Sequence, residues 1–152
     1  MKLIAHRGNR KGPNPLEENK PQYIIEAIAE GYDCEIDVRY INGEYFLGHD
    51  TPDYKIELEF LFVFSDKLWI HCKNFEALNA LIQYSNLNVV WHQEDHYTLT
   101  SKKFIWAYPK MPTTERCIVL MPEWFNFEYG VCYGICSDFV ENIRQEHKFK
   151  NV

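Results

Sequence analysis

The sequence predicts an α/β protein, a compact (β/α)8 barrel of the TIM type in which loops replace several outer helices. Three observations predict this fold. Eight short apolar segments resemble strands, helical periodicity separates several of them, and ionisable residues stand at the ends of four strands. The chain has 152 residues, whereas such barrels usually need about 250, so some outer helices must be missing. A single domain, residues 1–152, is expected.

The first half of the chain supplies four of these strands, expected at residues 2–5, 32–41, 44–48 and 67–73. Asn42-Gly43 is a two-residue turn between the second and third strands. Helices are expected around residues 23–28, ended by Gly31, over 56–64, and after Asn74, which can cap a helix whose apolar face continues to Ile82.

The second half supplies the other four strands, at residues 88–92, 104–108, 117–121 and 131–136, and a final helix at 139–147. Segments 93–103, 109–116 and 122–130 lack helical periodicity, so loops are expected there in place of outer helices. A two-layer mixed sheet with fewer helices is the competing architecture.

Charge, cysteine content and the length of apolar stretches argue against some classes of protein. The net charge is −6 and the basic residues are dispersed, which argues against a nucleic-acid partner. Five cysteines, an odd number and mostly in apolar segments, fit small buried side chains in a reducing compartment. No apolar stretch is long enough to span a membrane, so a cytoplasmic protein is expected. The oligomeric state stays open, because strand faces left bare by missing helices would suit a second subunit.

Candidate site residues gather at strand ends. Glu35 and Asp37 alternate with apolar residues, so both carboxylates are expected on one face of a strand, where a metal or cations must relieve their repulsion. His71 and Lys73 alternate in the same way on another strand, and two further strands end in His6-Arg7 and His49. Carboxylate oxygens suit Mg²⁺ or Ca²⁺.

Four motifs resemble the glycerophosphodiester phosphodiesterase family, within the superfamily of phospholipase C-like phosphodiesterases. They are His6-Arg7-Gly8, Glu18-Asn19, Glu35-Ile36-Asp37-Val38 and Gly48-His49-Asp50, in the family's order and spacing. The resemblance covers about the first third of the chain. It implies a (β/α)8 barrel, a divalent cation held by carboxylates, and two histidines that act as general acid and base.

Carried over to this chain, the resemblance makes His6 and His49 the catalytic acid and base. Glu35 and Asp37 would hold the metal, and Arg7 and Lys73 would bind the phosphate.

The chain departs from the family at His71, where a third metal-binding glutamate is usual. Mg²⁺ or Ca²⁺ remains the expected metal, with Mn²⁺ or Zn²⁺ as alternatives because an imidazole ligand shifts the preference towards them. His71, Glu18 and Glu123 are the candidates for a further ligand, and Glu18 can instead orient its neighbours. The segment between His49 and Lys73 is short, so a small phosphodiester substrate is expected.

The expected function is metal-dependent hydrolysis of a small glycerophosphodiester-like substrate. Two alternatives remain: a catalytically degenerate phosphate-binding domain, and a lyase that forms a cyclic phosphate. His92 and His96 are expected to be contacts at the barrel mouth or surface residues. Asp138 is expected to cap the last helix rather than to point into the mouth.

Overall fold

The structure is a computed structural model that describes residues 1–149, with side chains through His147. Its strands are β1 (Lys2–His6), β2 (Asp33–Ile41), β3 (Glu44–Leu47), β4 (Tyr54–Ile56), β5 (Leu68–Cys72), β6 (Val89–Val90), β7 (Tyr97–Leu99), β8 (Ile105–Ala107), β9 (Cys117–Leu120) and β10 (Gly134–Ser137). Its helices are α1 (Pro21–Ala29), α2 (Leu58–Val63), α3 (Phe75–Leu81), α4 (Val140–Phe149) and the 3-10 helix η1 (Pro122–Trp124).

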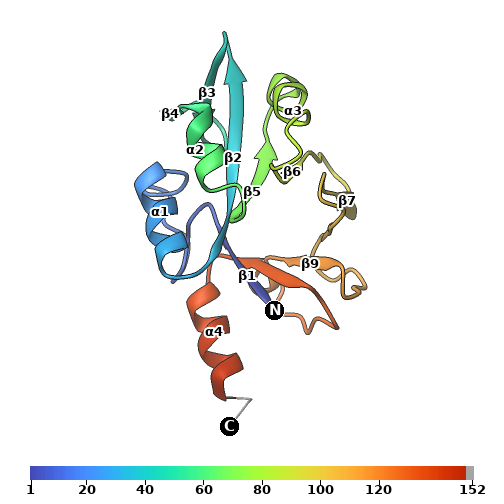
Figure 1. Ribbon diagram of the computed structural model, residues 1–152. Coiled ribbons are helices and arrows are strands. Elements are labelled where there is room, and N and C mark those ends of the chain that lie inside the picture. Colours follow the sequence, from blue (N-terminus) through green and yellow to red (C-terminus); the bar gives the residue numbers. More distant parts are fainter. Residues whose placement is uncertain (150–152) are drawn as a thin grey trace.

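Seven strands run parallel to one another, in the order β6-β5-β2-β1-β10-β9-β8. Three more pair antiparallel. β3 pairs with the end of β2 and also with β4, and β7 pairs with β8. Figure 1 shows the β2–β3 hairpin projecting beyond the rest of the sheet. The result is a curled, mixed half-barrel with four α-helices among residues 1–149.

The predicted closed parallel barrel is therefore wrong. The third predicted strand is present as β3, but it follows β2 through the two-residue turn Asn42-Gly43 and so can only run antiparallel. A parallel neighbour needs a crossover of a dozen or more residues. A closed barrel would also need β6 and β8 to be joined by strand pairing. Val89 of β6 instead makes two hydrogen bonds, 2.8 and 2.9 Å long, with Ser101 in the turn between β7 and β8. The competing prediction, a mixed sheet with fewer helices, is closer to the fold.

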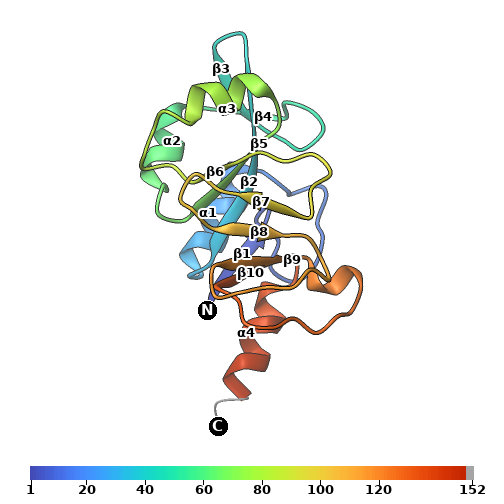
Figure 2. The ribbon, with the colours of Figure 1, turned by 90° about the vertical axis from the view of Figure 1, so that its right-hand side faces the viewer.

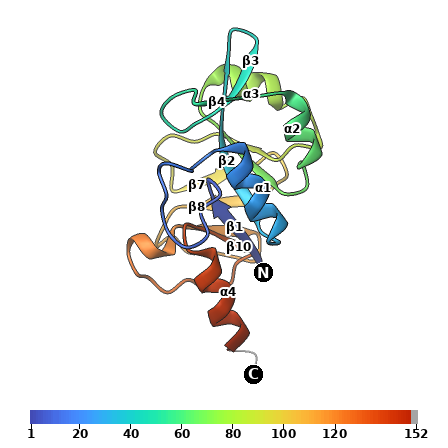
Figure 3. The same cartoon turned by 90° about the vertical axis from the view of Figure 1, so that its left-hand side faces the viewer.

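Four predicted helices are confirmed. Figure 3 shows α1, α2 and α4 along one side of the molecule. α1 begins with Pro21, whose fixed φ suits a first helical turn, and Gly31 follows its end with a φ of +91°. Asn74 caps α3 by accepting a hydrogen bond of 3.2 Å from the backbone N–H of Ala77.

The described residues form two hydrophobic cores, and the alternating side chains of β1 and β5 contribute to both. The larger core lies between the helices and the sheet, and it contains Cys34, Ile36 and Val38 of β2 together with Ile24 and Leu61 from the helices. The smaller core fills the inner face of the curled sheet with the following side chains: Ile4, Trp69, Trp106, Ile118 and Cys136. The polar residues of β2 therefore share the inner face with this second core.

Most of the second half of the chain carries no covering helix. Figure 2 shows β7, β8 and β9 with loops around them and no helix in front. The prediction of loops holds for residues 109–116, whereas segment 93–103 contains β7 and segment 122–130 contains η1. Among residues 1–149, the helices are all too short or too polar to cross a bilayer.

Candidate functional site

The carboxyl ends of β1, β2 and β5 lie side by side, which brings the predicted residues of three strands together. His6 of β1 pairs in register with Glu35 of β2, and Asp37 of β2 pairs with His71 of β5. Because the three strands are parallel and adjacent, these four side chains meet on the inner face of the sheet. The predicted alternation of Glu35 and Asp37 with apolar residues is confirmed, since the apolar set packs under the helices.

Glu35, Asp37 and His71 form a compact cluster. One ligand atom from each side chain lies within 4.8 Å of the others. His71 Nδ1 is 3.6 Å from Glu35 Oε1 and 3.3 Å from Asp37 Oδ1. Asp37 is completely buried, and its Oδ1 atom has no hydrogen-bond partner of good geometry. A bound cation or an ordered water would satisfy such a buried carboxylate oxygen.

Two cationic side chains lie close to the buried carboxylate of Asp37. Arg7 Nε lies 3.0 Å from Asp37 Oδ2, and Lys73 Nζ lies 3.8 Å from Asp37 Oδ1. The Arg7 side chain also donates a hydrogen bond of 3.0 Å to Glu18 Oε2, and its backbone N–H donates one of 3.2 Å to Glu35 Oε2. Both residues predicted to bind phosphate are therefore held against the carboxylate cluster.

The turn after β1 explains why His6-Arg7-Gly8 stand together. Arg7 has a φ of +54° and Gly8 a φ of +88°, so the chain reverses direction immediately after the strand. A Cβ atom on Gly8 would lie 2.8 Å from Cδ1 of Tyr23, so only glycine fits against that ring. The reversal places the Arg7 guanidinium over the ends of the neighbouring strands.

His6 is held by Asp138, which follows β10. His6 Nδ1 lies 2.7 Å from Asp138 Oδ1, and the same carboxylate oxygen accepts a hydrogen bond of 2.9 Å from the Asn9 side chain. His6 Nε2 then points towards Glu35, 3.9 Å from Oε2. The expected capping role of Asp138 is not observed; the backbone N–H of Glu141 in the first turn of α4 instead donates a hydrogen bond of 3.0 Å to the carbonyl of Arg10.

The environment shifts the ionisation of both inner histidines in the same direction. Burial, the strongest influence, disfavours the charged imidazole of His6, but Asp138 and Glu35 outweigh it and raise the pKa of His6. The pKa of His71 is likewise raised by Asp37 and Glu35 against the effect of burial. Burial favours a higher pKa for Asp37, yet contact with His71 and Arg7 holds that pKa well below its usual range. The site therefore balances carboxylates against cations.

His49 approaches the site from the loop after β3. Its side chain is 38% exposed, and its Nδ1 lies 2.7 Å from Asp50 Oδ1. Gly48 before it has a φ of +147°, and a Cβ there would lie 2.0 Å from the backbone oxygen of Thr51. Arg39 donates a hydrogen bond of 3.3 Å to the carbonyl of Gly48. The backbone of the loop after β3 is therefore tightly constrained next to His49.

His92 is a contact at the site rather than an isolated surface residue. Its ring stacks on that of His71, with centroids 4.5 Å apart and planes 14° from parallel. Burial and the charge of His71 lower the pKa of His92. His96, in contrast, is exposed.

The other two candidate ligands bind protein groups. Glu18 accepts hydrogen bonds from Arg7 and Asn9, which is the orienting role. Glu123 accepts the Ser137 hydroxyl at 3.0 Å and the backbone N–H of Asp138 at 2.9 Å, so it supports the residue that holds His6. Neither belongs to the three-residue cluster.

Two asparagines of the site have no role in the sequence-based prediction. Asn19 donates a hydrogen bond of 2.9 Å to Asp37 Oδ2 and accepts one of 2.9 Å from the backbone N–H of Asp37. Asn9 links Glu18 to Asp138. The sequence could have indicated a role for Asn19, because Asn19 directly follows Glu18 in the Glu18-Asn19 motif. The sequence gives no such indication for Asn9, since its partners Glu18 and Asp138 lie far apart in the chain.

The side chains surround a cavity of about 140 Å³. Its histidine, arginine and carboxylate lining residues are His6, Arg7, Glu35, His49, His71 and His92. The two histidines predicted to be acid and base therefore line the same cavity as two members of the carboxylate–histidine cluster. The volume is below the roughly 300–1,000 Å³ of sites for drug-sized ligands, which suits a small polar group such as a phosphate ester.

The donor set fits a divalent cation. Two carboxylates and one imidazole offer oxygen and nitrogen ligands, and Asp37 Oδ1, which lies 3.3 Å from His71 Nδ1, makes no hydrogen bond of good geometry. An imidazole ligand favours Mn²⁺ or Zn²⁺ relative to an all-oxygen site for Mg²⁺ or Ca²⁺.

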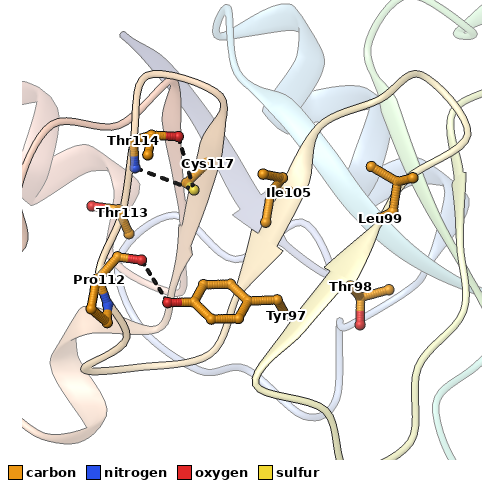
Figure 4. Close-up of a pocket in the computed structure, with 8 residues that line it drawn as sticks. All are labelled: Tyr97, Thr98, Leu99, Ile105, Pro112, Thr113, Thr114 and Cys117. Carbon is orange, nitrogen blue, oxygen red and sulfur yellow. Dashed lines mark hydrogen bonds between the residues drawn. The ribbon is translucent and has the colours of Figure 1, made fainter.

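A second, wider cavity of about 590 Å³ lies over β7, β8 and β9. Figure 4 shows its lining: Tyr97, Thr98, Leu99, Ile105, Pro112, Thr113, Thr114 and Cys117. The Tyr97 hydroxyl donates a hydrogen bond of 2.8 Å to the carbonyl of Pro112. This lining has no carboxylate, histidine or cation, so it offers none of the chemistry of the first cavity.

No family model matches the chain, and no curated protein or solved structure is significantly similar to it. The resemblance to glycerophosphodiester phosphodiesterases therefore depends on the four motifs.

Proposed function

We propose that this protein is a metal-dependent phosphodiesterase that cleaves a small glycerophosphodiester-like substrate. The observation that carries the proposal is the cluster of Glu35, Asp37 and His71, of which Glu35 and His71 line one cavity together with His6 and Arg7. Acid–base groups, a cluster suited to a cation, and a guanidinium are the parts that cleavage of a phosphodiester requires.

Each residue has a proposed task. His6 and His49 exchange protons with the attacking and departing oxygens. Asp138 holds His6 through Nδ1, so Nε2, which lies 3.9 Å from Glu35 Oε2, is the nitrogen that would exchange a proton with the substrate. Arg7 and Lys73 neutralise the charge on the phosphate oxygens. Glu35, Asp37 and His71 would hold a divalent ion, whose charge would stabilise the same oxygens in the transition state.

The proposed reaction begins when a free hydroxyl of the glycerol group attacks phosphorus. One histidine takes the hydroxyl proton as the new P–O bond forms. The other donates a proton to the departing alcohol as the old P–O bond breaks. The immediate product is a cyclic phosphate, and attack by water would open it to glycerol phosphate. The alternative lyase would stop at the cyclic product, so phosphorus NMR of the products separates the two reactions.

The test is the release of product from a panel of glycerophosphodiesters with Mg²⁺, Ca²⁺, Mn²⁺, Zn²⁺ or chelator. We expect metal-dependent turnover that falls about 10²–10⁴-fold in both His6→Ala and His49→Ala, the usual contribution of a positioned proton-transfer group. His96→Ala is the matched control, because His96 is exposed. Folded protein that turns over no ester with any metal would refute the proposal.

A phosphate-binding domain without turnover is the second candidate. The contacts of His71 favour it, because a protonated imidazole between Glu35 and Asp37, together with Arg7 3.0 Å from Asp37, supplies two positive charges for the two carboxylates without a metal. Calorimetric titration decides between the candidates. Phosphate binding without metal binding or turnover would support this second function.

The cytoplasm is the proposed location. The cysteines of the chain are free thiols, and four of them are buried: Cys34, Cys72, Cys117 and Cys136. Free thiols are stable in a reducing compartment.

A further inference from the structure

The cavity at the candidate site has two chemically different sides. The ends of β1, β2 and β5, together with His49 and His92, provide the ionisable side. The opposite wall comes from the second half of the chain and is apolar, consisting of Trp106, Tyr108, Pro109, Leu120, Met121 and Trp124. The proposed chemistry uses only the ionisable side, so the apolar wall has no assigned role.

This wall extends from the interior to the protein surface. Trp106 is only 6% exposed and packs on Trp69, with ring centroids 5.8 Å apart. Trp124 is 55% exposed and Tyr108 is 44% exposed. Phe125, next to Trp124, is also largely exposed. A group that enters along the wall would therefore pass exposed aromatic rings before it reaches the buried one.

The wall has no carboxylate and no cationic side chain, and its polar side-chain groups are the Tyr108 hydroxyl and the indole N–H groups of Trp106 and Trp124. Glu35 is the one carboxylate among the described lining residues, and it contacts Arg7 and His71. Glu123 lies next to Trp124 in the chain, but its carboxylate accepts hydrogen bonds from Ser137 and Asp138. A hydrocarbon group needs no such partner and gains free energy when it leaves water.

We propose that one of the two alcohols esterified to the phosphate is an alkyl chain, which lies along this wall while the phosphate contacts the ionisable side. The inference rests on the proposed function and specifies its substrate class. The substrate is then a single-chain amphiphile rather than a diester with two polar alcohols. The chain would leave the cavity past Trp124, so its length is not limited by the 140 Å³ volume.

The kinetic test uses glycerol phosphodiesters of methanol, propanol, hexanol and octanol, all below their micellar concentrations. We expect kcat/KM to rise about fourfold for each methylene that becomes buried, and then to level off. In Trp124→Ala the increase per methylene should be smaller, so the loss grows with chain length. Leu99→Ala, an exposed apolar residue at the second cavity, is the matched control and should follow the wild type.

A binding test separates this inference from the proposed function. Methyl, hexyl and octyl phosphate are titrated while the fluorescence of the tryptophans is followed, which requires no turnover. Tighter binding of the longer chains, weakened in Trp124→Ala, supports the apolar subsite even if no ester is cleaved. Equal affinity for all three phosphates would overturn it, as would equal turnover along the alkyl series or faster turnover of glycerophosphocholine, which would indicate a subsite for a cationic group.

Discussion

Replacement of Asp37 by asparagine tests the charge balance of the site. Asp37 is completely buried and lies 3.0 Å from Arg7 Nε, 3.3 Å from His71 Nδ1 and 3.8 Å from Lys73 Nζ. Asparagine keeps the shape but leaves these cations without their shared anion. Removal of one partner from a buried ion pair costs about 3–5 kcal/mol. Because Asp37→Asn also relieves repulsion with Glu35, we expect a loss near the lower limit, about 3 kcal/mol.

The assay is thermal unfolding at neutral pH with chelator present. For a chain of this size, about 3 kcal/mol corresponds to a decrease in Tm of roughly 6–12 °C. Asp50→Asn is the matched control, because Asp50 is 90% exposed beside His49, and its Tm should be close to that of the wild type. An unchanged or higher Tm for Asp37→Asn would refute the reasoning, since it would mean that the buried carboxylate is unfavourable until a metal binds.

Three further predictions concern single contacts. Gly48→Ala should lower kcat by displacing His49, because its Cβ would lie 2.0 Å from a backbone oxygen; unchanged kcat would mean that the loop adapts without cost. Asp138→Asn should lower the pKa of His6 measured by NMR in the metal-free protein, because it removes an anion that raises this pKa. Since that pKa is raised, the stabilisation from His6 is complete below about pH 6.5 and is lost as the pH rises through the folded-state value, so the variant should lose stability mainly at low pH. Asn74→Ala should lower the free energy of unfolding by about 0.5–2 kcal/mol in urea denaturation, through loss of the α3 cap.

Local chemistry explains which expectations about the fold were correct. The period-two pattern of β2 is readable because its apolar residues face helices while Glu35 and Asp37 face inward. The Asn42-Gly43 pair also predicts the turn that the structure contains, and this turn has a consequence for the sheet. A two-residue turn forces β3 to run antiparallel to β2, so β3 cannot be a strand of a parallel barrel.

The sequence by itself determined the strands that carry the candidate site, because alternation, turn residues and helix caps are local properties. The tertiary structure alone decided that the sheet stays an open half-barrel, since closure depends on pairing between strands far apart in the chain. It also decided that Asp138 holds His6 across 132 positions of sequence, and that Trp106 and Trp124 face the ionisable cluster. Such contacts arise from the curvature of the whole sheet, which no local pattern encodes.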